Sequence, residues 1–295
     1  MAVDGVQLRA DRHPLLRAGR AGGPDLAAYQ GGAGLGAMSA VSAAAPLLEV
    51  SQLNKHFGGL HAVKNVSFRV QRGEIVGVLG PNGAGKTTLY NLLTGFISPD
   101  AGASIRFAGR SLLGLAPHRI AGLGISRTFQ LCRPFVGMSV AENVIVGALG
   151  SRRHGVTDHE ALAAGLLGRV GLAGKDKLPV EVLSYGDQRR LEIARALAAR
   201  PALLLLDEPF AGLGSGEIED LSTLIRQVHA EEGLTVVLIE HKLREFMRLV
   251  SRVIALDFGE VIAEGTPEAI VQHPAVIEAY IGRGNVDPLE AGRAA

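Results

Sequence analysis

A glycine-rich run over residues 80–88, GPNGAGKTT, carries the residue types that bind phosphate groups. It fits the pattern G-x-x-x-x-G-K-[ST], in which glycines let successive backbone N–H groups converge on phosphate oxygens. Lys86 would place a positive charge on the β- and γ-phosphates, and Thr87 would offer a hydroxyl to Mg²⁺. The sequence therefore predicts a nucleotide site, with a glycine-rich turn before a helix as the alternative.

Two carboxylates form a second candidate site. In LLLLDEP (203–209), Asp207 and Glu208 follow an apolar run that is typical of a buried strand. Ligands of open parallel sheets bind at the carboxyl ends of the strands. An Asp there can hold Mg²⁺, and the next carboxylate can orient or deprotonate an attacking water. The alternative is a pair of surface charges that end a strand.

The stretch LSYGDQRR (183–190) predicts the start of a helix. Ser184 and Asp187 have the spacing of a capping box, and Gly186 leaves room for a close backbone approach. The dipole of such a helix favours an anion at its N-terminus. We expect the Asp187 side chain to turn back to its own cap, away from any phosphate.

These residues need a framework of alternating strands and helices. The phosphate loop follows an apolar run over 73–80 and precedes a helix predicted over 86–94. Further along, apolar strands at 202–207, 235–240 and 252–257 alternate with predicted helices at 187–199, 216–231 and 242–249. This alternation predicts an α/β fold around a largely parallel sheet, divided by a mostly helical insertion over 131–185.

Composition excludes several classes of protein. The chain has 295 residues, is 47% hydrophobic and has a formal net charge of +1, which argues against a nucleic-acid binder held by bulk charge. Its single cysteine, Cys132, cannot form an intramolecular disulfide and is expected to be a small buried side chain. No apolar run reaches the roughly 18 residues that a membrane span needs.

In chain order, the phosphate loop, LSYGDQRR, LLLLDEP and LIEHK (238–242) resemble the motifs of ABC transporter ATPase subunits, over about residues 47–282. RTFQ (127–130), LSYGDQRRLEIARAL (183–197) and GTPEAIVQHPAVIEAYIG (265–282) are similar to segments of branched-chain amino acid importer ATPases. The resemblance implies a P-loop NTPase fold of the ABC ATPase type. Such a fold has a mainly parallel core sheet, an antiparallel β subdomain and an inserted helical subdomain, here at about 131–185.

The resemblance also implies roles for matching residues. Glu208 would be the general base, His241 would contact the γ-phosphate, and Gln130 would touch Mg²⁺ and water and sense the membrane partner. Mg²⁺ would be held by Thr87, Gln130 and Asp207. The ring of Phe57 would stack on adenine, with core packing as its alternative. The full set expected to bind ATP is Phe57, Val63, Gly80, Pro81, Asn82, Gly83, Ala84, Gly85, Lys86, Thr87, Thr88, Ser184 and Gly186.

Two positions depart from the family pattern. Asp187 stands where the family usually has Gln, and Gly214 stands where an Asp or Asn normally helps to couple two nucleotide sites. We expect activity to survive the first change and coupling to be altered by the second.

The resemblance predicts that the chain binds and hydrolyses ATP to power an ABC importer, for branched-chain amino acids. The alternatives are a urea or short-amide importer, an exporter ATPase of the lipopolysaccharide-transport type, or a soluble ABC-type ATPase acting in translation or DNA repair. The last class generally carries two cassettes or a long coiled-coil insertion, whereas this chain has one cassette and a short insertion.

The expected partners are transmembrane permease subunits and a second ATPase subunit, identical or paralogous, in a head-to-tail dimer. A periplasmic or extracellular solute-binding protein would act indirectly, and no nucleic acid is expected. The predicted location is peripheral, on the cytoplasmic face of the inner (plasma) membrane.

The ends of the chain differ in composition from the predicted ATPase domain at 47–282. Residues 1–46 are rich in Gly, Ala and Arg without periodicity and are predicted to be disordered. Residues 283–295 are expected to be a flexible tail. Met38 is a possible alternative start of translation.

Overall fold

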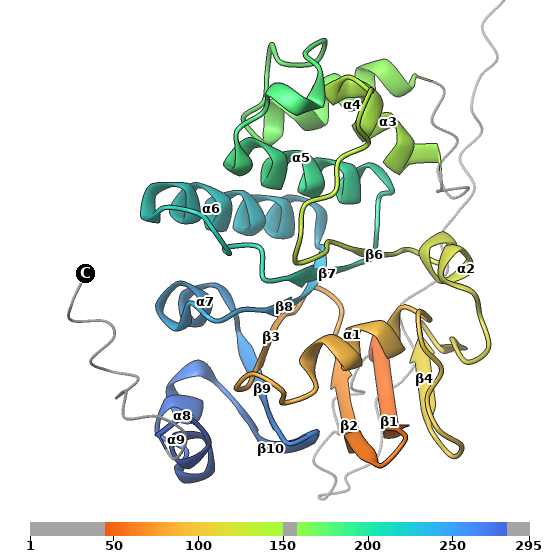
Figure 1. Cartoon of the computed structure of the whole chain (residues 1–295), viewed down its shortest axis with the longest axis vertical. Helices are drawn as coiled ribbons and strands as arrows, with labels where there is room; N and C mark the ends of the chain where they lie inside the picture. Colours follow the sequence, from red (N-terminus) through yellow and green to blue (C-terminus); the bar gives the residue numbers. More distant parts are fainter. Residues whose placement is uncertain (1–44, 150–157, 282–295) are drawn as a thin grey trace, which may run out of the picture. The chain divides into compact units, whose positions relative to one another are not determined.

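The computed structural model describes residues 45–149 and 158–281 (Figure 1). The predicted disordered extension falls outside these ranges except for residues 45 and 46, as do Met38 and the predicted tail over 283–295. The bounds proposed for the ATPase domain and its helical part stay predictions.

The central sheet is mainly parallel, as predicted. Within the described residues it has six strands, and all neighbouring pairs run parallel except the β9–β10 hairpin. In sheet order the strands are β10 (Glu260–Gly265), β9 (Arg252–Asp257), β3 (Ile75–Leu79), β8 (Thr235–Ile239), β7 (Leu203–Asp207) and β6 (Ile125–Arg127). Every residue of β3, β7 and β8 is buried, because both faces of the sheet are covered.

The run of four leucines in β7 supplies both faces of the sheet. Leu203 and Leu205 belong to the core shared with the phosphate-loop helix and the antiparallel sheet. Leu204 and Leu206 belong to the core on the opposite face, which the larger helices fill. The two-residue period of a strand therefore explains why the run is apolar throughout.

A second sheet is antiparallel, in agreement with the predicted β subdomain. Its order is β2 (Leu60–Val70), β1 (Leu48–Phe57), β4 (Ser104–Phe107) and β5 (Arg110–Ser111). The β1–β2 hairpin pairs Leu48 with Val70 and Phe57 with Leu60. Phe57 therefore lies at the tip of this hairpin (Figure 1).

The helices divide between the sheet and a separate packed group. The elements are α1 (Lys86–Leu93), α2 (Pro117–Gly122), α3 (Val140–Leu149), α4 (His159–Arg169), a 3₁₀ turn (Val180–Val182), α5 (Tyr185–Ala198), α6 (Ser215–Glu232), α7 (Leu243–Leu249), α8 (Pro267–Val271) and α9 (Pro274–Ile281). Helices α3, α4 and α5 pack against one another at the top of Figure 1. No helix in the two described ranges combines the length and apolar character of a membrane span.

Candidate active site

The phosphate loop joins the end of β3 to the start of α1. Gly83 and Gly85 have φ values of +83° and +100°, which other residues rarely adopt. A Cβ on Gly85 would also lie 2.6 Å from the Ala62 carbonyl oxygen. Gly85 is the N-cap of α1, and no described side chain caps this helix. The first N–H groups of α1 are therefore available to an anion.

Lys86 folds back over this loop. Its Nζ donates hydrogen bonds to the carbonyl oxygens of Gly80 (2.7 Å) and Pro81 (3.0 Å), and the residue is buried. Burial lowers the pKa of Lys86, and the charges of Glu208 and Asp207 oppose that shift. A buried ammonium whose hydrogen bonds go to neutral oxygens fits a site that receives an anionic ligand.

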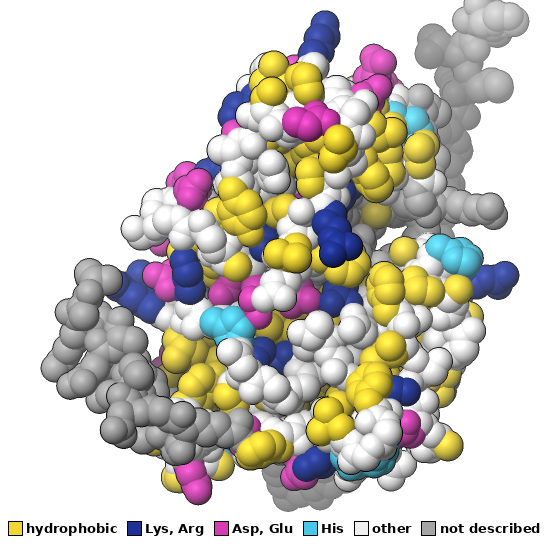
Figure 2. Space-filling model, in the orientation of Figure 1, with side chains coloured by type: hydrophobic (Ala, Val, Ile, Leu, Met, Phe, Trp, Pro, Cys, Tyr) yellow, Lys and Arg dark blue, Asp and Glu magenta, His cyan; other side chains and the backbone are white. Residues whose placement is uncertain are grey.

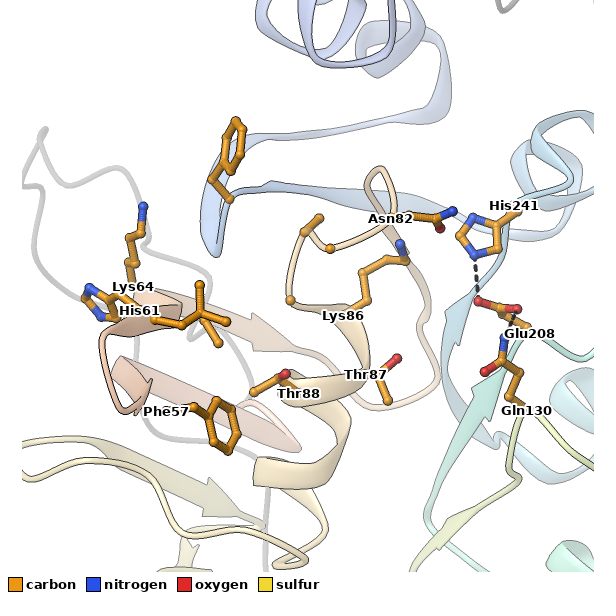
Figure 3. A pocket seen from close by; sticks show the side chains of 16 residues that line it. Phe57, His61, Lys64, Asn82, Lys86, Thr87, Thr88, Gln130, Glu208 and His241 are labelled. Atoms are coloured by element: carbon orange, nitrogen blue, oxygen red, sulfur yellow. Dashed lines mark hydrogen bonds and ion pairs between the residues drawn. The ribbon is translucent and has the colours of Figure 1, made fainter. Parts of the chain in front are cut away.

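Glu208 is held between two side chains from neighbouring segments (Figure 3). Gln130 Nε2 donates to Glu208 Oε2 at 2.8 Å, and His241 Nε2 lies 2.6 Å from Glu208 Oε1. Glu208 has φ +49°, a backbone conformation that non-glycine residues seldom adopt outside functional sites. Gln130, Glu208 and His241 follow β6, β7 and β8, so the carboxyl edge of the sheet assembles them, although only the position of Glu208 at this edge was predicted.

Asp207 precedes Glu208 and is the last residue of β7. Its carboxylate is 4% exposed and its Oδ2 lies 2.9 Å from Nη2 of Arg127, whose side chain is 6% exposed. Burial raises the pKa of Asp207, and Arg127 opposes the shift. Arg127 had no predicted role, although it is the first residue of the RTFQ segment.

The three residues expected to hold Mg²⁺ offer oxygen atoms. Thr87 is exposed, and Gln130 turns its Nε2 to Glu208, which leaves its amide oxygen on the side of Thr87 (Figure 3). Elsewhere, the described His, Cys, Asp and Glu side chains form no group of three that could hold a metal ion. Two neutral oxygens and the Asp207 carboxylate match the oxygen preference of Mg²⁺, which usually binds through few carboxylates together with substrate phosphates.

A cavity of about 650 Å³ connects Phe57 to His241. Its lining residues are Phe57, Leu60, His61, Ala62, Lys64, Asn82, Gly83, Ala84, Gly85, Lys86, Thr87, Thr88, Gln130, Glu208, His241 and Phe258. Phe57 is 47% exposed, so its alternative interpretation as a core residue is wrong. Of the predicted residues, Val63 is buried in the core, Gly80 and Pro81 accept bonds from Lys86, and none of these three lines the cavity.

Five lining residues were missed by sequence reasoning. Leu60, His61, Ala62 and Lys64 arrive with β2, and Phe258 occupies the β9–β10 turn. In that turn, Gly259 N donates to the Ala84 carbonyl (3.0 Å), and Lys64 N donates to the Gly259 carbonyl (2.8 Å). The β9–β10 turn is therefore bonded to both the phosphate loop and β2. No short sequence motif predicts this contact.

Ser184 and Gly186 lie outside the cavity, at the start of α5. Ser184 Oγ accepts a hydrogen bond from Asp187 N at 3.2 Å, so the predicted N-cap is present. The expectation that the Asp187 carboxylate turns back to this cap is wrong, because its Oδ2 pairs with Lys175 Nζ at 2.5 Å. A lysine from the preceding loop thus compensates the charge of the unusual residue.

Gly214 is the N-cap of α6 and has no side chain to offer. Its N–H donates instead to Glu217 Oε2 at 2.9 Å. The other oxygen of Glu217 lies so near Gly186 that a Cβ there would overlap it. The starts of α5 and α6 are therefore in contact through Glu217.

Helix α5 also fixes the backbone around Gln130. Arg189 Nη1 donates to the Phe129 carbonyl at 2.8 Å, and its Nη2 bonds the Gln130 carbonyl. Phe129 N in turn donates to Glu192 Oε1 at 2.9 Å. Arg189 and Glu192 pair with each other at 3.1 Å and are 2% and 5% exposed, so the segment before Gln130 is tied to a buried ion pair.

Cys132 lies beside this pair, and its Sγ contacts Glu192 Oε2 at 3.5 Å. Burial, followed by the charge of Glu192, raises the pKa of the thiol to about 12. The thiol is therefore protonated at neutral pH. The side chain is only half-buried, in contrast to the predicted small core residue.

Helix α9 is linked to the phosphate loop through Tyr280. The Tyr280 side chain on α9 packs against the main core. Burial raises the pKa of its hydroxyl to about 12, although a hydrogen bond with the backbone of Gly80 acts to lower that pKa. The C-terminal segment is thereby linked to the first residue of the loop.

Two family models match the chain. The model described as "ABC transporter" matches residues 63–211, and the model described as "Branched-chain amino acid ATP-binding cassette transporter" matches residues 260–285. The first range includes the phosphate loop and the acidic pair, and the second includes α8 and α9.

Curated relatives resemble the chain over nearly their whole length. The high-affinity branched-chain amino acid transport ATP-binding protein BraF of Pseudomonas aeruginosa is 42% identical over 251 residues, covering 80% of this chain and 98% of BraF. The protein LivG of Salmonella typhimurium, which carries the same description, is 43% identical with the same coverage.

Solved structures have the same fold. The ADP conformation of MJ1267, an ATP-binding cassette of an ABC transporter, superimposes with a TM-score of 0.72 at 29% identity, over 81% of this chain and all of that one. A dimeric post-hydrolysis state of the cassette MJ0796, bound to ADP and Pi, gives 0.68 at 26% identity over 75% and 98% of the two chains.

Proposed function

The chain belongs to the family of ABC transporter ATP-binding proteins, and on that basis we propose that it powers an importer for branched-chain amino acids. The predicted family, fold and ATPase activity are confirmed by the family model, the relatives and the solved cassettes. The solute is taken from the names of the relatives BraF and LivG and from the C-terminal family model. The observation that carries the hydrolytic part is Glu208, held between Gln130 and His241 beside the phosphate loop.

Nucleotide binding follows from the cavity. Phe57 offers an exposed aromatic face for adenine at one end, and the loop N–H groups with Lys86 offer positive charge for the phosphates at the other. The volume of about 650 Å³ is that of a typical small-molecule site. The space between Phe57 and Lys86 therefore suits a nucleotide laid along the start of α1 (Figure 3).

Hydrolysis depends on the placement of Glu208. Its carboxylate can accept a proton from a water that attacks the γ-phosphate, while Gln130 and His241 keep both of its oxygens oriented. Thr87, Gln130 and Asp207 would hold Mg²⁺, which neutralises charge on the phosphates when bound. Typical turnover for such an enzyme is about 1–10³ s⁻¹.

The second part of the site comes from another subunit. Ser184 and Gly186 lie outside the cavity of their own chain, at a helix N-terminus suited to an anion. We place them on the γ-phosphate bound by a facing ATPase, identical or paralogous, in a head-to-tail dimer. The similar cassette MJ0796 has been solved as a dimer, which supports a second ATPase subunit.

A groove of about 360 Å³ provides a place for a membrane partner. It lies where α2, α3, α5 and β6 meet, and it is lined by residues that include Phe96, His118, Phe129, Phe135 and Arg195. We call it the partner groove. Figure 2 shows hydrophobic side chains over α3 and α4, and charged side chains near the ends of β7 and β8. We place a cytoplasmic segment of a permease subunit in this groove, which makes the chain a peripheral protein of the inner membrane.

The test uses the chain copurified with its permease and reconstituted in lipid vesicles. ATP hydrolysis should rise when the solute-binding protein loaded with leucine, isoleucine or valine is added. Stimulation by the urea-loaded or short-amide-loaded protein instead would assign the alternative importer. Hydrolysis that responds to no solute-binding protein would reject import.

A further inference from the structure

Arg127 contacts both Asp207 in the active site and the aromatic rings of the partner groove. We propose that Arg127 is a positioning residue that fixes the metal-binding carboxylate Asp207 and transmits occupation of the partner groove to it. The proposal rests on the proposed function for the identity of the groove's occupant. It adds a second connection to that of Gln130, because Gln130 reaches Glu208 whereas Arg127 reaches Asp207.

On the side of the active site, Arg127 is held by three polar groups. Its Nη2 lies 2.9 Å from Asp207 Oδ2, and its Nη1 donates to Asn91 Oδ1 (2.7 Å) and Thr94 Oγ1 (3.3 Å). Asn91 lies on α1 and Thr94 is its C-cap, so the same guanidinium binds the phosphate-loop helix and the end of β7. With Oδ2 engaged by Arg127, the other oxygen of Asp207 is left for a metal ion.

On the side of the groove, the guanidinium lies against aromatic rings. It is 4.9 Å from the ring centre of Phe129 and 6.0 Å from that of Phe96, and these two rings meet edge to face at 5.8 Å. Both rings line the partner groove and are 41% and 55% exposed. A segment that enters the groove must therefore contact the rings that hold the charge in place.

A third aromatic neighbour of the guanidinium is held in place on the buried side. The ring centre of Tyr90 lies 5.4 Å away, and the residue is fully buried; its hydroxyl donates to the Val237 carbonyl (2.7 Å) and also lies 3.2 Å from the Leu206 carbonyl. A displacement of Arg127 is therefore easier towards the exposed rings of Phe129 and Phe96 than towards Tyr90. Such a displacement changes the distance between its charge and Asp207.

The present position of Arg127 also leaves one donor unused. Its Nε is buried and has no hydrogen-bond partner among the described residues. A buried donor without an acceptor is costly, so an arrangement that supplies one is favoured. A carbonyl or carboxylate of a segment bound in the groove would supply it and draw the guanidinium from Asp207.

A second arginine in the same groove provides a matched control. Arg195 lies 5.1 Å from the ring centre of Phe135, and both line the groove. Its Nη1 donates to the Arg133 carbonyl (3.0 Å), and it forms no ion pair with Asp207 or Glu208. The Phe135–Arg195 pair therefore resembles the Phe129–Arg127 pair, but its arginine does not contact the active-site carboxylates.

The experiment measures Mn²⁺ binding to the full-length chain with ADP, by electron paramagnetic resonance, and needs no catalytic turnover. Arg127→Lys and Phe129→Ala should weaken Mn²⁺ binding about 10-fold, the usual loss when a residue that orients a metal ligand is changed. Arg195→Lys and Phe135→Ala should bind Mn²⁺ as the wild type does. ADP binding in EDTA should be the same in all five proteins.

Unchanged Mn²⁺ binding in Phe129→Ala would overturn the proposal, as would equal weakening in Phe135→Ala. If Arg127→Lys does not fold, judged by its thermal unfolding, the two exposed phenylalanine variants decide the result. Failure of the wild type to bind ADP would instead reject the proposed nucleotide site, so the two failures are distinguishable.

Discussion

Glu208 is the residue on which hydrolysis should depend most. In Glu208→Gln, the amide keeps the size of the side chain and can still bond Gln130 or His241, but it cannot accept a proton from water. We expect nucleotide binding to persist, turnover to be abolished and a nucleotide-bound dimer to accumulate. Phosphate release and gel filtration with ATP measure these effects, with the exposed Glu231→Gln as control. Phosphate release at the wild-type rate would refute the assigned role.

Among single residues, the sequence predicted those that belong to a short contiguous motif. The phosphate loop and the acidic pair were found because each is a short run of fixed spacing. Arg127 was not, because its role depends on a buried partner 80 positions away. Phe258 was missed for the same reason, since only the pairing of its hairpin with β2 brings it to the cavity.

Helix α5 contains two adjacent arginines with different expected effects on stability. Arg189 is 2% exposed and pairs with buried Glu192, so Arg189→Ala should lower the free energy of unfolding by about 3–5 kcal/mol. Arg190 is 24% exposed and pairs with Asp220, which is 65% exposed, so Arg190→Ala should lose about 0–1 kcal/mol. Urea denaturation compares the two. Equal losses would contradict the structural role of the Arg189–Glu192 pair.

The start of α5 should also depend on the charge of Lys175. Lys175→Ala leaves the Asp187 carboxylate uncompensated where we place a γ-phosphate, so ATPase activity of the assembled complex should fall about 10-fold. The double variant Lys175→Ala with Asp187→Gln should recover most of it, because the negative charge is gone. A double variant as slow as the single one would show that Lys175 acts in another way.

Elements with strong patterns were predicted well, and short ones were not. The strands at 202–207 and 235–240 and the helix at 216–231 match β7, β8 and α6 within one residue at each end. β6 was missed because it has three residues and a polar sequence, and it forms only by pairing with β7. In the antiparallel sheet, pairing in the hairpin with β2 carries β1 as far as Phe57.

For the molecule as a whole, Tyr280 should contribute to stability in a pH-dependent way. Its pKa is about 12 in the folded chain, against a usual value of 10, so its protonated form stabilises the fold. This contribution is complete below pH 10 and is lost as the pH rises towards 12, and it amounts to about 2–3 kcal/mol. Tyr280→Phe should therefore flatten the fall in unfolding free energy between pH 10 and 12, measured by urea denaturation. An unchanged slope would contradict the buried environment of the hydroxyl.

Cys132 gives a matching control for this measurement. Its pKa of about 12 lies above the ordinary thiol value of 9, so its contribution is lost in the same direction but from a lower pH. Cys132→Ala should change the slope from pH 9 upwards, and Tyr280→Phe should change it only above pH 10. The two side chains can therefore be separated by where their effects begin.

The bonds from Gly259 to Ala84 and Lys64 mean that the ribosome must have synthesised the β9–β10 turn before the nucleotide cavity has all its walls. The loop around Asn82 emerges long before Phe258, the last lining residue. At ordinary rates of synthesis the interval between them is about 10–35 s. During that time the β9–β10 turn contributes nothing to any stabilisation of the nascent chain by bound ATP.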